Sequence, residues 1–171
     1  LGSNVELFSW PWPADIQGAL TWSIGRWQAD KDVGLSAYDS AKGVFHIFNS
    51  GVKTFDFSQT FEYGGIDASS LPLIGDWDGN GLDSIGIYRA VSKQVHLRNS
   101  LDAGSANTSF GFSDDAVESD TIATTVNLEK STVVALYSSS AALVSFPVSE
   151  NSQAPFLFGS PSEQKFVVPV R

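Results

Sequence analysis

The sequence predicts an all-β fold, and three observations support this prediction. Short segments alternate apolar and polar residues, as where Val95 and Leu97 alternate with His96 and Arg98. Gly, Ser, Asp and Asn residues separate these segments, which is typical of turns between strands. Long runs of Ala, Leu, Glu and Lys are missing, so helices are not expected to dominate.

Composition and charge exclude several classes of protein. The chain of 171 residues has a net charge of −9, and no Lys/Arg cluster offsets this charge, so we expect no nucleic-acid partner. No apolar run approaches about 20 residues, so no membrane insertion is expected. Cysteine is absent, which removes disulfides and thiolate metal sites.

An internal repeat becomes visible when the chain is shifted by 50 positions. The segment from Ile24 to Ser50 then lies over the segment from Ile74 to Ser100 without a gap. Seven positions are identical, and the matched pairs are Ile24/Ile74, Gly25/Gly75, Trp27/Trp77, Tyr38/Tyr88, His46/His96, Asn49/Asn99 and Ser50/Ser100. A third, more diverged copy places Tyr137 where Tyr88 stands. The chain therefore divides into a partial repeat or latch strand (1–18) and three repeats (19–68, 69–120 and 121–171, the last with the start of a further strand).

Each repeat carries about four short apolar segments. In the second repeat these are Leu71–Trp77, Ser84–Arg89, Gln94–Asn99 and Thr108–Ser113. Four antiparallel strands in about 50 residues make the blade of a β-propeller. A β-trefoil-like fold also has three units of four strands, and an open or partial propeller is the other alternative. Three repeats are fewer than the roughly four blades of a closed ring, so a longer parent chain and a homo-oligomer are also expected possibilities.

The second repeat resembles a known family. Its segments GDWDGNG, IYR, HLRNS and SFGF, between Pro72 and Ser113, are similar to the bacterial FG-GAP/VCBS-type repeats, which are related to the integrin α-chain propeller blades. The first repeat keeps the frame but loses the acidic loop. The resemblance implies propeller-type blades in a secreted or cell-surface protein that is used for adhesion or ligand binding, and it implies no reaction.

The loop DWDGNG is the main candidate for a metal site. It places Asp76, Asp78 and Asn80 at every second residue, with Gly81 directly behind them. Calcium takes six to eight oxygen ligands, and alternating Asp and Asn side chains with a Gly bend supply such ligands from a short loop. The Leu82 carbonyl would add another oxygen. The sequence therefore predicts at most one calcium ion, bound by this loop.

The closing end of the loop departs from the family pattern. The integrin-like form has an Asp at position 9 of the loop, where this chain has Ser84, and Asp83 stands one position earlier. Both residues belong to the candidate calcium set. The alternative is a turn without metal, in which the Asx side chains accept hydrogen bonds from their own backbone. In the first repeat Arg26 replaces the first ligand and brings a positive charge, so a cation is not expected there.

Aromatic and histidine side chains supply the remaining candidates. Trp10, Trp12 and Trp22 lie close together in the sequence and are candidates for stacking on sugar rings, or for packing as a latch over the first repeat. His46 and His96 occupy equivalent positions in two repeats, and we expect both to face solvent on separate blades. No triad spacing or phosphate-binding glycine loop stands out, so no enzyme is predicted.

The function expected from the sequence is therefore binding. We expect a non-catalytic binding or adhesion module of a secreted or cell-surface bacterial protein, with a carbohydrate or protein ligand and one stabilising calcium ion. The alternatives are a structural spacer or assembly module, and an accessory domain of an extracellular hydrolase.

Overall fold

The computed structural model describes residues 20–29, 33–48, 57–112, 121–127, 132–138, 143–145 and 156–157. Within these residues there are twelve β-strands and no helix. The prediction of an all-β fold is confirmed. No helix of the described residues could cross a membrane.

The strands form three four-stranded sheets, and in each sheet the strands are paired in chain order. Every pair is antiparallel. Sheet 1 contains β1 (Leu20–Gly25), β2 (Gly34–Asp39), β3 (Val44–Phe48) and β4 (Phe57–Glu62). Sheet 2 contains β5 (Ser70–Gly75), β6 (Ser84–Arg89), β7 (Gln94–Arg98) and β8 (Thr108–Gly111). Sheet 3 contains β9 (Thr121–Asn127), β10 (Thr132–Ser138), β11 (Leu143–Ser145) and β12 (Phe156–Leu157).

Sheets 1 and 2 repeat each other in register as well as in order. Gly25 pairs with Gly34 at the end of the first hairpin, and Gly75 pairs with Ser84 at the equivalent place 50 residues later. The four strands expected in the second repeat are confirmed, each to within two residues at its ends. The sheets lie within the ranges 19–68, 69–120 and 121–171.

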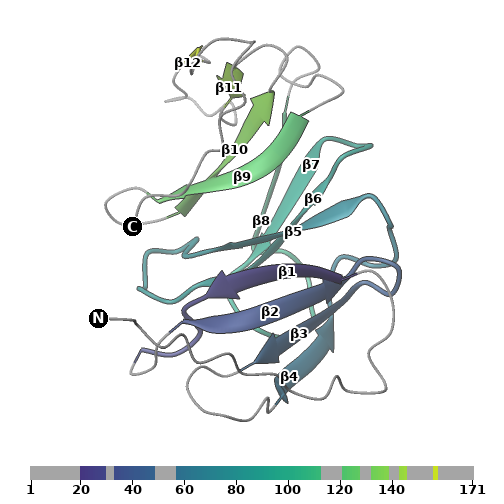
Figure 1. The fold of residues 1–171 in the computed structure, drawn as a ribbon, viewed down its shortest axis with the longest axis vertical. Helices are drawn as coiled ribbons and strands as arrows, with labels where there is room; N and C mark the ends of the chain where they lie inside the picture. Colours follow the sequence, from purple (N-terminus) through teal and green to yellow (C-terminus); the bar gives the residue numbers. More distant parts are fainter. Residues whose placement is uncertain are drawn as a thin grey trace, which may run out of the picture.

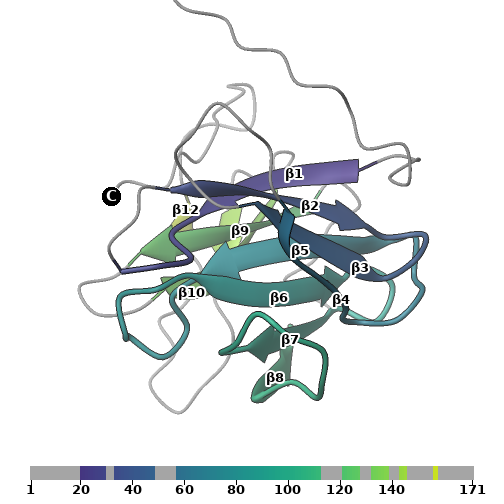
Figure 2. The same cartoon turned by 90° about the horizontal axis from the view of Figure 1, so that it is seen from below.

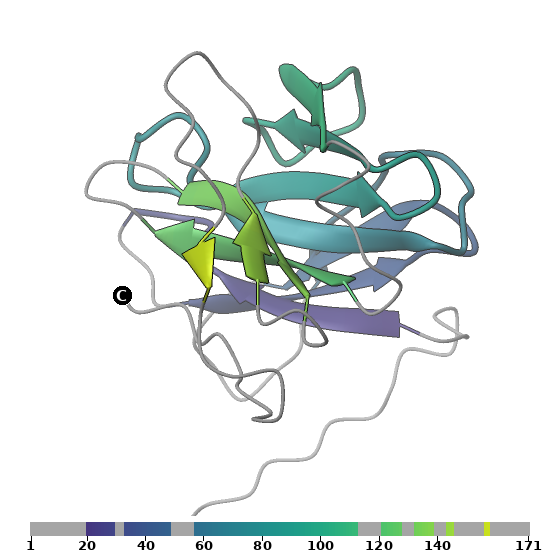
Figure 3. The same ribbon diagram turned by 90° about the horizontal axis from the view of Figure 1, so that it is seen from above.

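The three sheets are stacked one after another along the long axis of the molecule (Figure 1). The first strand of sheet 2, β5, contacts the first strands of the other two sheets, β1 and β9. Seen from below and from above, these first strands run roughly along one another (Figures 2 and 3). The sheets stay separate and are not closed into a barrel.

Two hydrophobic cores fill the junctions between the sheets. Because successive side chains of a strand point to opposite faces of the sheet, β6 contributes side chains to both cores. Ile85 and Ile87 are fully buried in the first core, together with Tyr38 and Phe45 of sheet 1. The next side chain, Tyr88, is buried in the second core. That core also contains Leu73, Val95, Leu97, Phe112, Val134 and Leu136. Sheet 2 therefore has apolar faces on both sides, as a middle layer requires.

The two tryptophans that match between the repeats both pack in the junctions between the sheets. Trp27 is buried in the first core, and Trp77 packs against the second. The Trp77 indole N–H also donates a hydrogen bond of 2.9 Å to the Ile85 carbonyl. Both rings therefore belong to the interior of the stack.

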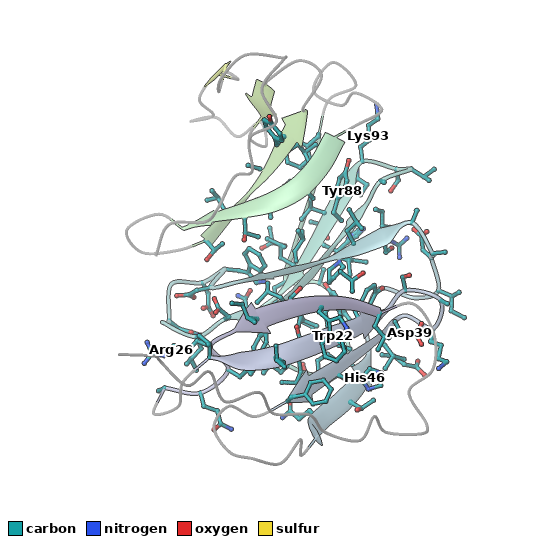
Figure 4. All side chains as sticks on the ribbon, viewed as in Figure 1. Trp22, Arg26, Asp39, His46, Tyr88 and Lys93 are labelled. Atoms are coloured by element: carbon teal, nitrogen blue, oxygen red, sulfur yellow. The ribbon has the colours of Figure 1, made fainter. Side chains whose placement is uncertain are left out.

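The hairpin turns between the second and third strands need a left-handed residue at one position. Gly43 fills this position in sheet 1 with a φ of 68°, and Lys93 fills it in sheet 2 with a φ of 55°. Figure 4 places Lys93 at the edge of sheet 2, beyond Tyr88. Among the described residues Lys93 is the non-glycine residue with a positive φ, so its turn carries local strain that Gly43 avoids.

Candidate functional site

The loop between β5 and β6 is organised around the Asp76 side chain. One carboxylate oxygen of Asp76 accepts the N–H of Asn80 at 3.0 Å, and the other accepts the N–H of Gly81 at 2.8 Å. Gly81 has a φ of 87°, which lets the chain bend sharply at this point. One side chain thus holds the loop in a closed turn.

Two further side chains of the loop make short-range bonds of the same kind. Asp78 accepts the N–H of Asn80 at 3.3 Å, and the Asn80 side-chain oxygen accepts the N–H of Leu82 at 2.8 Å. These are the Asx contacts expected of a turn that is stable without metal. The structure therefore brings Asp76, Asp78 and Asn80 together in one loop, in contact with its backbone.

The last two candidate ligands are engaged elsewhere. The Asp83 carboxylate accepts the backbone N–H of Arg26, in the loop that follows β1, at 2.7 Å. The Ser84 hydroxyl is buried and donates to the Gly75 carbonyl at 3.3 Å. Both oxygen groups are thus hydrogen-bonded away from the side chains of Asp76, Asp78 and Asn80.

The oxygen atoms that remain available as metal ligands fit a weak calcium site and do not complete a full set of protein ligands. Each carboxylate oxygen has two lone pairs, so Asp76 and Asp78 keep acceptor capacity beyond the bonds described. Within the described ranges, no group of three or more His, Cys, Asp or Glu side chains is placed to hold a metal ion. A cation in this loop would depend on two carboxylates, an amide oxygen, backbone carbonyls and water.

The equivalent loop of sheet 1 is built differently. Arg26 stands where Asp76 stands in sheet 2, and its guanidinium donates to the Ala29 carbonyl at 3.0 Å. Figure 4 shows Arg26 at the end of sheet 1 that lies opposite Asp39. The remaining carboxylates of this loop, Asp30 and Asp32, lie outside the described residues. Nothing at Arg26 favours a cation.

A hollow of about 230 Å³ lies where the first strands of the three sheets meet. Five apolar residues and two residues with hydroxyl groups line it, so its surface is mixed. The lining residues are Ser23, Ile24, Pro72, Leu73, Ile74, Ala123 and Thr125. Ile24 is 58% exposed, so an exposed apolar side chain lies at the opening of the hollow.

One of the predicted tryptophans lies on the strand that borders this hollow. Trp22 is on β1 and is 44% exposed, with its ring centroid 5.8 Å from that of Phe48. Leu71, on β5, is 37% exposed. Trp10 and Trp12 lie outside the described residues. The sequence pattern does not mark Ile24 or Leu71 as exposed, because a single apolar strand residue looks the same whether it is covered or exposed.

The two histidines occupy equivalent places on separate sheets and do not meet. The Nδ1 atom of His46 lies 3.2 Å from the Thr60 hydroxyl, and that of His96 lies 2.9 Å from the Ser109 hydroxyl. The expectation that both face solvent is wrong for His46, which is only 9% exposed. Burial, with a smaller contribution from the positive charge of Arg89, lowers the pKa of His96. A repeated His–hydroxyl pair between neighbouring strands is a structural contact.

An arginine-centred loop follows β7. The Arg98 guanidinium binds the Asp102 carboxylate, with 2.7 Å between Nη2 and Oδ1, and also donates to the backbone carbonyls of Asp102, Ala103 and Ser105. Hydrogen bonds from Ser100 and from Arg98 lower the pKa of Asp102. All the guanidinium contacts are internal to residues 98–105, so this cluster stabilises the loop.

Compared with known proteins, the chain matches no family model, no curated protein and no solved structure.

Proposed function

We propose that this chain is a non-catalytic binding module built from propeller-type blades, belonging to a secreted or cell-surface protein. Three four-stranded antiparallel sheets that follow each other in the chain and pack face to face support the blade interpretation. The position of β5 beside both β1 and β9 also supports it, because the first strands of propeller blades surround a common axis. The FG-GAP/VCBS-like motifs of the second repeat agree with this architecture.

The observation that carries the binding proposal is the exposed apolar surface at the first strands. Trp22, Ile24 and Leu71 are large apolar side chains that remain exposed on β1 and β5, and Ile24 also lines the hollow of about 230 Å³. Exposed large apolar side chains and a nearby concavity are both features of binding sites. An exposed indole can stack on a sugar ring, and Trp22 is 44% exposed, so a carbohydrate is the first ligand class to test and a protein the second.

The test is a glycan-array screen with labelled protein, followed by titration of any ligand against tryptophan fluorescence. Trp22→Ala should abolish the fluorescence response and weaken binding by at least about tenfold, since aromatic contacts in binding sites contribute about 1–3 kcal/mol. Val91→Ala is the matched control, because Val91 is an exposed apolar residue (84%) in the turn after β6. Equal binding by the wild type and the Trp22→Ala variant would contradict the assignment of this surface.

We propose further that one calcium ion stabilises the loop from Asp76 to Ser84. The support is the oxygen-rich composition of the loop and its resemblance to the integrin-like form of the FG-GAP/VCBS-type repeat loop. The Asp76→Ala/Asp78→Ala double variant should lower the melting temperature more in calcium than in chelator, because only the wild type can gain stability from the ion. An equal decrease in both buffers would mean that the two carboxylates act only as turn residues.

The same surface also favours a second function, that of an assembly module. Exposed apolar side chains on the first strands would be covered if further blades from another copy or from a longer parent chain completed the ring. Light scattering separates the two functions: a monomer of 18.3 kDa at high concentration would contradict self-assembly, and a dimer or larger species would contradict an uncovered binding surface. An accessory role beside an extracellular hydrolase would be established by a catalytic domain in the same gene.

A further inference from the structure

The loops at one end of the stack connect each sheet to the next by a pair of hydrogen bonds. Between sheets 1 and 2, the backbone N–H of Arg26 donates to the Asp83 carboxylate at 2.7 Å. In return, the backbone N–H of Asp83 donates to the Arg26 carbonyl at 2.8 Å. The first residue after β1 is thus joined to the residue that precedes β6.

Between sheets 2 and 3 the same pair occurs again. The backbone N–H of Asp76 donates to the Thr132 hydroxyl at 3.0 Å, and the backbone N–H of Thr132 donates to the Asp76 carbonyl at 2.7 Å. Asp76 is the first residue after β5, as Arg26 is the first after β1. The two contacts therefore share their geometry: backbone to side-chain oxygen in one direction, and backbone to backbone in the other.

The two side-chain acceptors are also equivalent in the repeat. Tyr88 and Tyr137 match between the second and third repeats, and 49 positions separate them, as they separate Asp83 and Thr132. An Asp and a Thr thus supply the same acceptor oxygen. At the equivalent position of sheet 1 stands Val33, whose side chain has no acceptor. At this described position, therefore, sheet 1 offers no side-chain acceptor to a sheet before it, while its Arg26 backbone is paired with the next sheet.

We propose that Asp83 and Thr132 are positioning residues that fix the end of one sheet's first strand against the following sheet. Backbone groups at a strand end lose the partners that the sheet supplies, and pairing them across the junction satisfies them and sets the spacing of the two sheets. The nine residues from Asp76 to Ser84 contribute to both junctions, because Asp76 is hydrogen-bonded to sheet 3 and Asp83 is hydrogen-bonded to the loop after β1 of sheet 1. In this role Asp83 acts through the backbone of Arg26 and is not a calcium ligand.

The test is amide hydrogen exchange by NMR on the whole chain, in chelator and without ligand, so its outcome is independent of the binding proposal. Asp83→Ala should accelerate exchange of the Arg26 amide at least about tenfold and leave the Asp76 amide unchanged, since a hydrogen bond to a charged group is the protection removed. Thr132→Val should accelerate exchange of the Asp76 amide and leave the Arg26 amide unchanged. Asp83→Asn and Thr132→Ser keep an acceptor oxygen and should restore slow exchange.

Two results would overturn the proposal. The first is an equal rise in the exchange rates of the Arg26 and Asp76 amides in both Asp83→Ala and Thr132→Val, which would indicate general destabilisation. The other is unchanged exchange at both amides. If a loss variant does not fold, the wild type supplies a second measurement: a scalar coupling across the hydrogen bond from the Thr132 amide nitrogen to the Asp76 carbonyl carbon is expected, and its absence would contradict the contact.

Discussion

The close approach of sheets 2 and 3 predicts a specific steric effect at Gly75. A methyl group added to Gly75 would lie 2.6 Å from Cγ2 and 2.7 Å from Cβ of Thr132, and 2.7 Å from a ring carbon of Trp77. These distances are well inside ordinary van der Waals contact, so Gly75→Ala must push β5 and β10 apart. The glycine is required here by space, because its φ does not lie in the left-handed region.

The magnitude follows from two opposing contributions. Overpacking in a filled interior costs about 1–3 kcal/mol. Replacing Gly by Ala lowers the entropy of the unfolded chain and returns about 0.4–1 kcal/mol. A net loss of about 1–2 kcal/mol is expected in the free energy of unfolding. For a chain of this length each kcal/mol corresponds to about 2–4 °C, so the melting temperature should fall by about 2–8 °C.

The assay is thermal unfolding followed by circular dichroism, with a second substitution to identify the cause. Thr132→Ser removes Cγ2 and keeps the hydroxyl that accepts from Asp76, so it should recover part of the loss in a Gly75→Ala background. Gly81→Ala is the matched control: no atom lies within 4 Å of the added methyl group, and its φ of 87° makes the substitution unfavourable through strain alone. Thr132→Ser should not rescue it. A melting temperature unchanged by Gly75→Ala, or strictly additive effects in the double variant, would refute the reasoning.

Three further predictions concern strain and ionisation. Lys93→Gly should raise the free energy of unfolding by up to about 1 kcal/mol, because it removes a left-handed non-glycine residue, and urea unfolding would show no gain if the turn were unstrained. Because burial and Arg89 lower the pKa of His96 below 6.5, the unfolded chain binds more protons than the folded one. The stability contributed by neutral His96 should be complete above about pH 6.5 and lost as the pH falls through the folded pKa. This decrease should be absent in His96→Gln. Burial raises the pKa of Tyr63 from 10.0 to about 12, so its contribution should be complete below pH 10 and lost as the pH rises towards 12. Difference titration of phenolate absorbance against Tyr63→Phe would contradict this if the difference appeared near pH 10.

Much of the fold was predictable because it depends on local periodicity. The alternation around Val95 and Leu97 predicted β7, and the shift of 50 residues that aligns Tyr38 with Tyr88 predicted that β2 and β6 are equivalent. Both inferences need only the two-residue period of a strand and turn residues between strands. The Asx pattern of Asp76, Asp78 and Asn80 allowed two interpretations, a calcium loop and a turn closed by its own side chains, and the hydrogen bonds to the backbone are those of the turn.

The candidate site was less predictable because it depends on which residues from different sheets meet. Nothing in the residue type of Asp83 distinguishes a metal ligand from an acceptor for Arg26 on another sheet. Ile24 and His46 both stand on strands with alternating pattern, yet Ile24 is exposed beside the hollow and His46 is buried. Solvent exposure of a strand residue is decided by what covers that face.

By itself, then, the sequence determined that the chain forms strands, that these come in groups of four, and that one loop concentrates Asp and Asn side chains, because each of these depends on residues close together in the chain. Only the tertiary structure decided that the groups stack through β1, β5 and β9, that Asp83 and Thr132 join successive sheets, and that a hollow opens between the first strands. These features arise from contacts between residues about 50 positions apart, and a single sequence does not record such contacts.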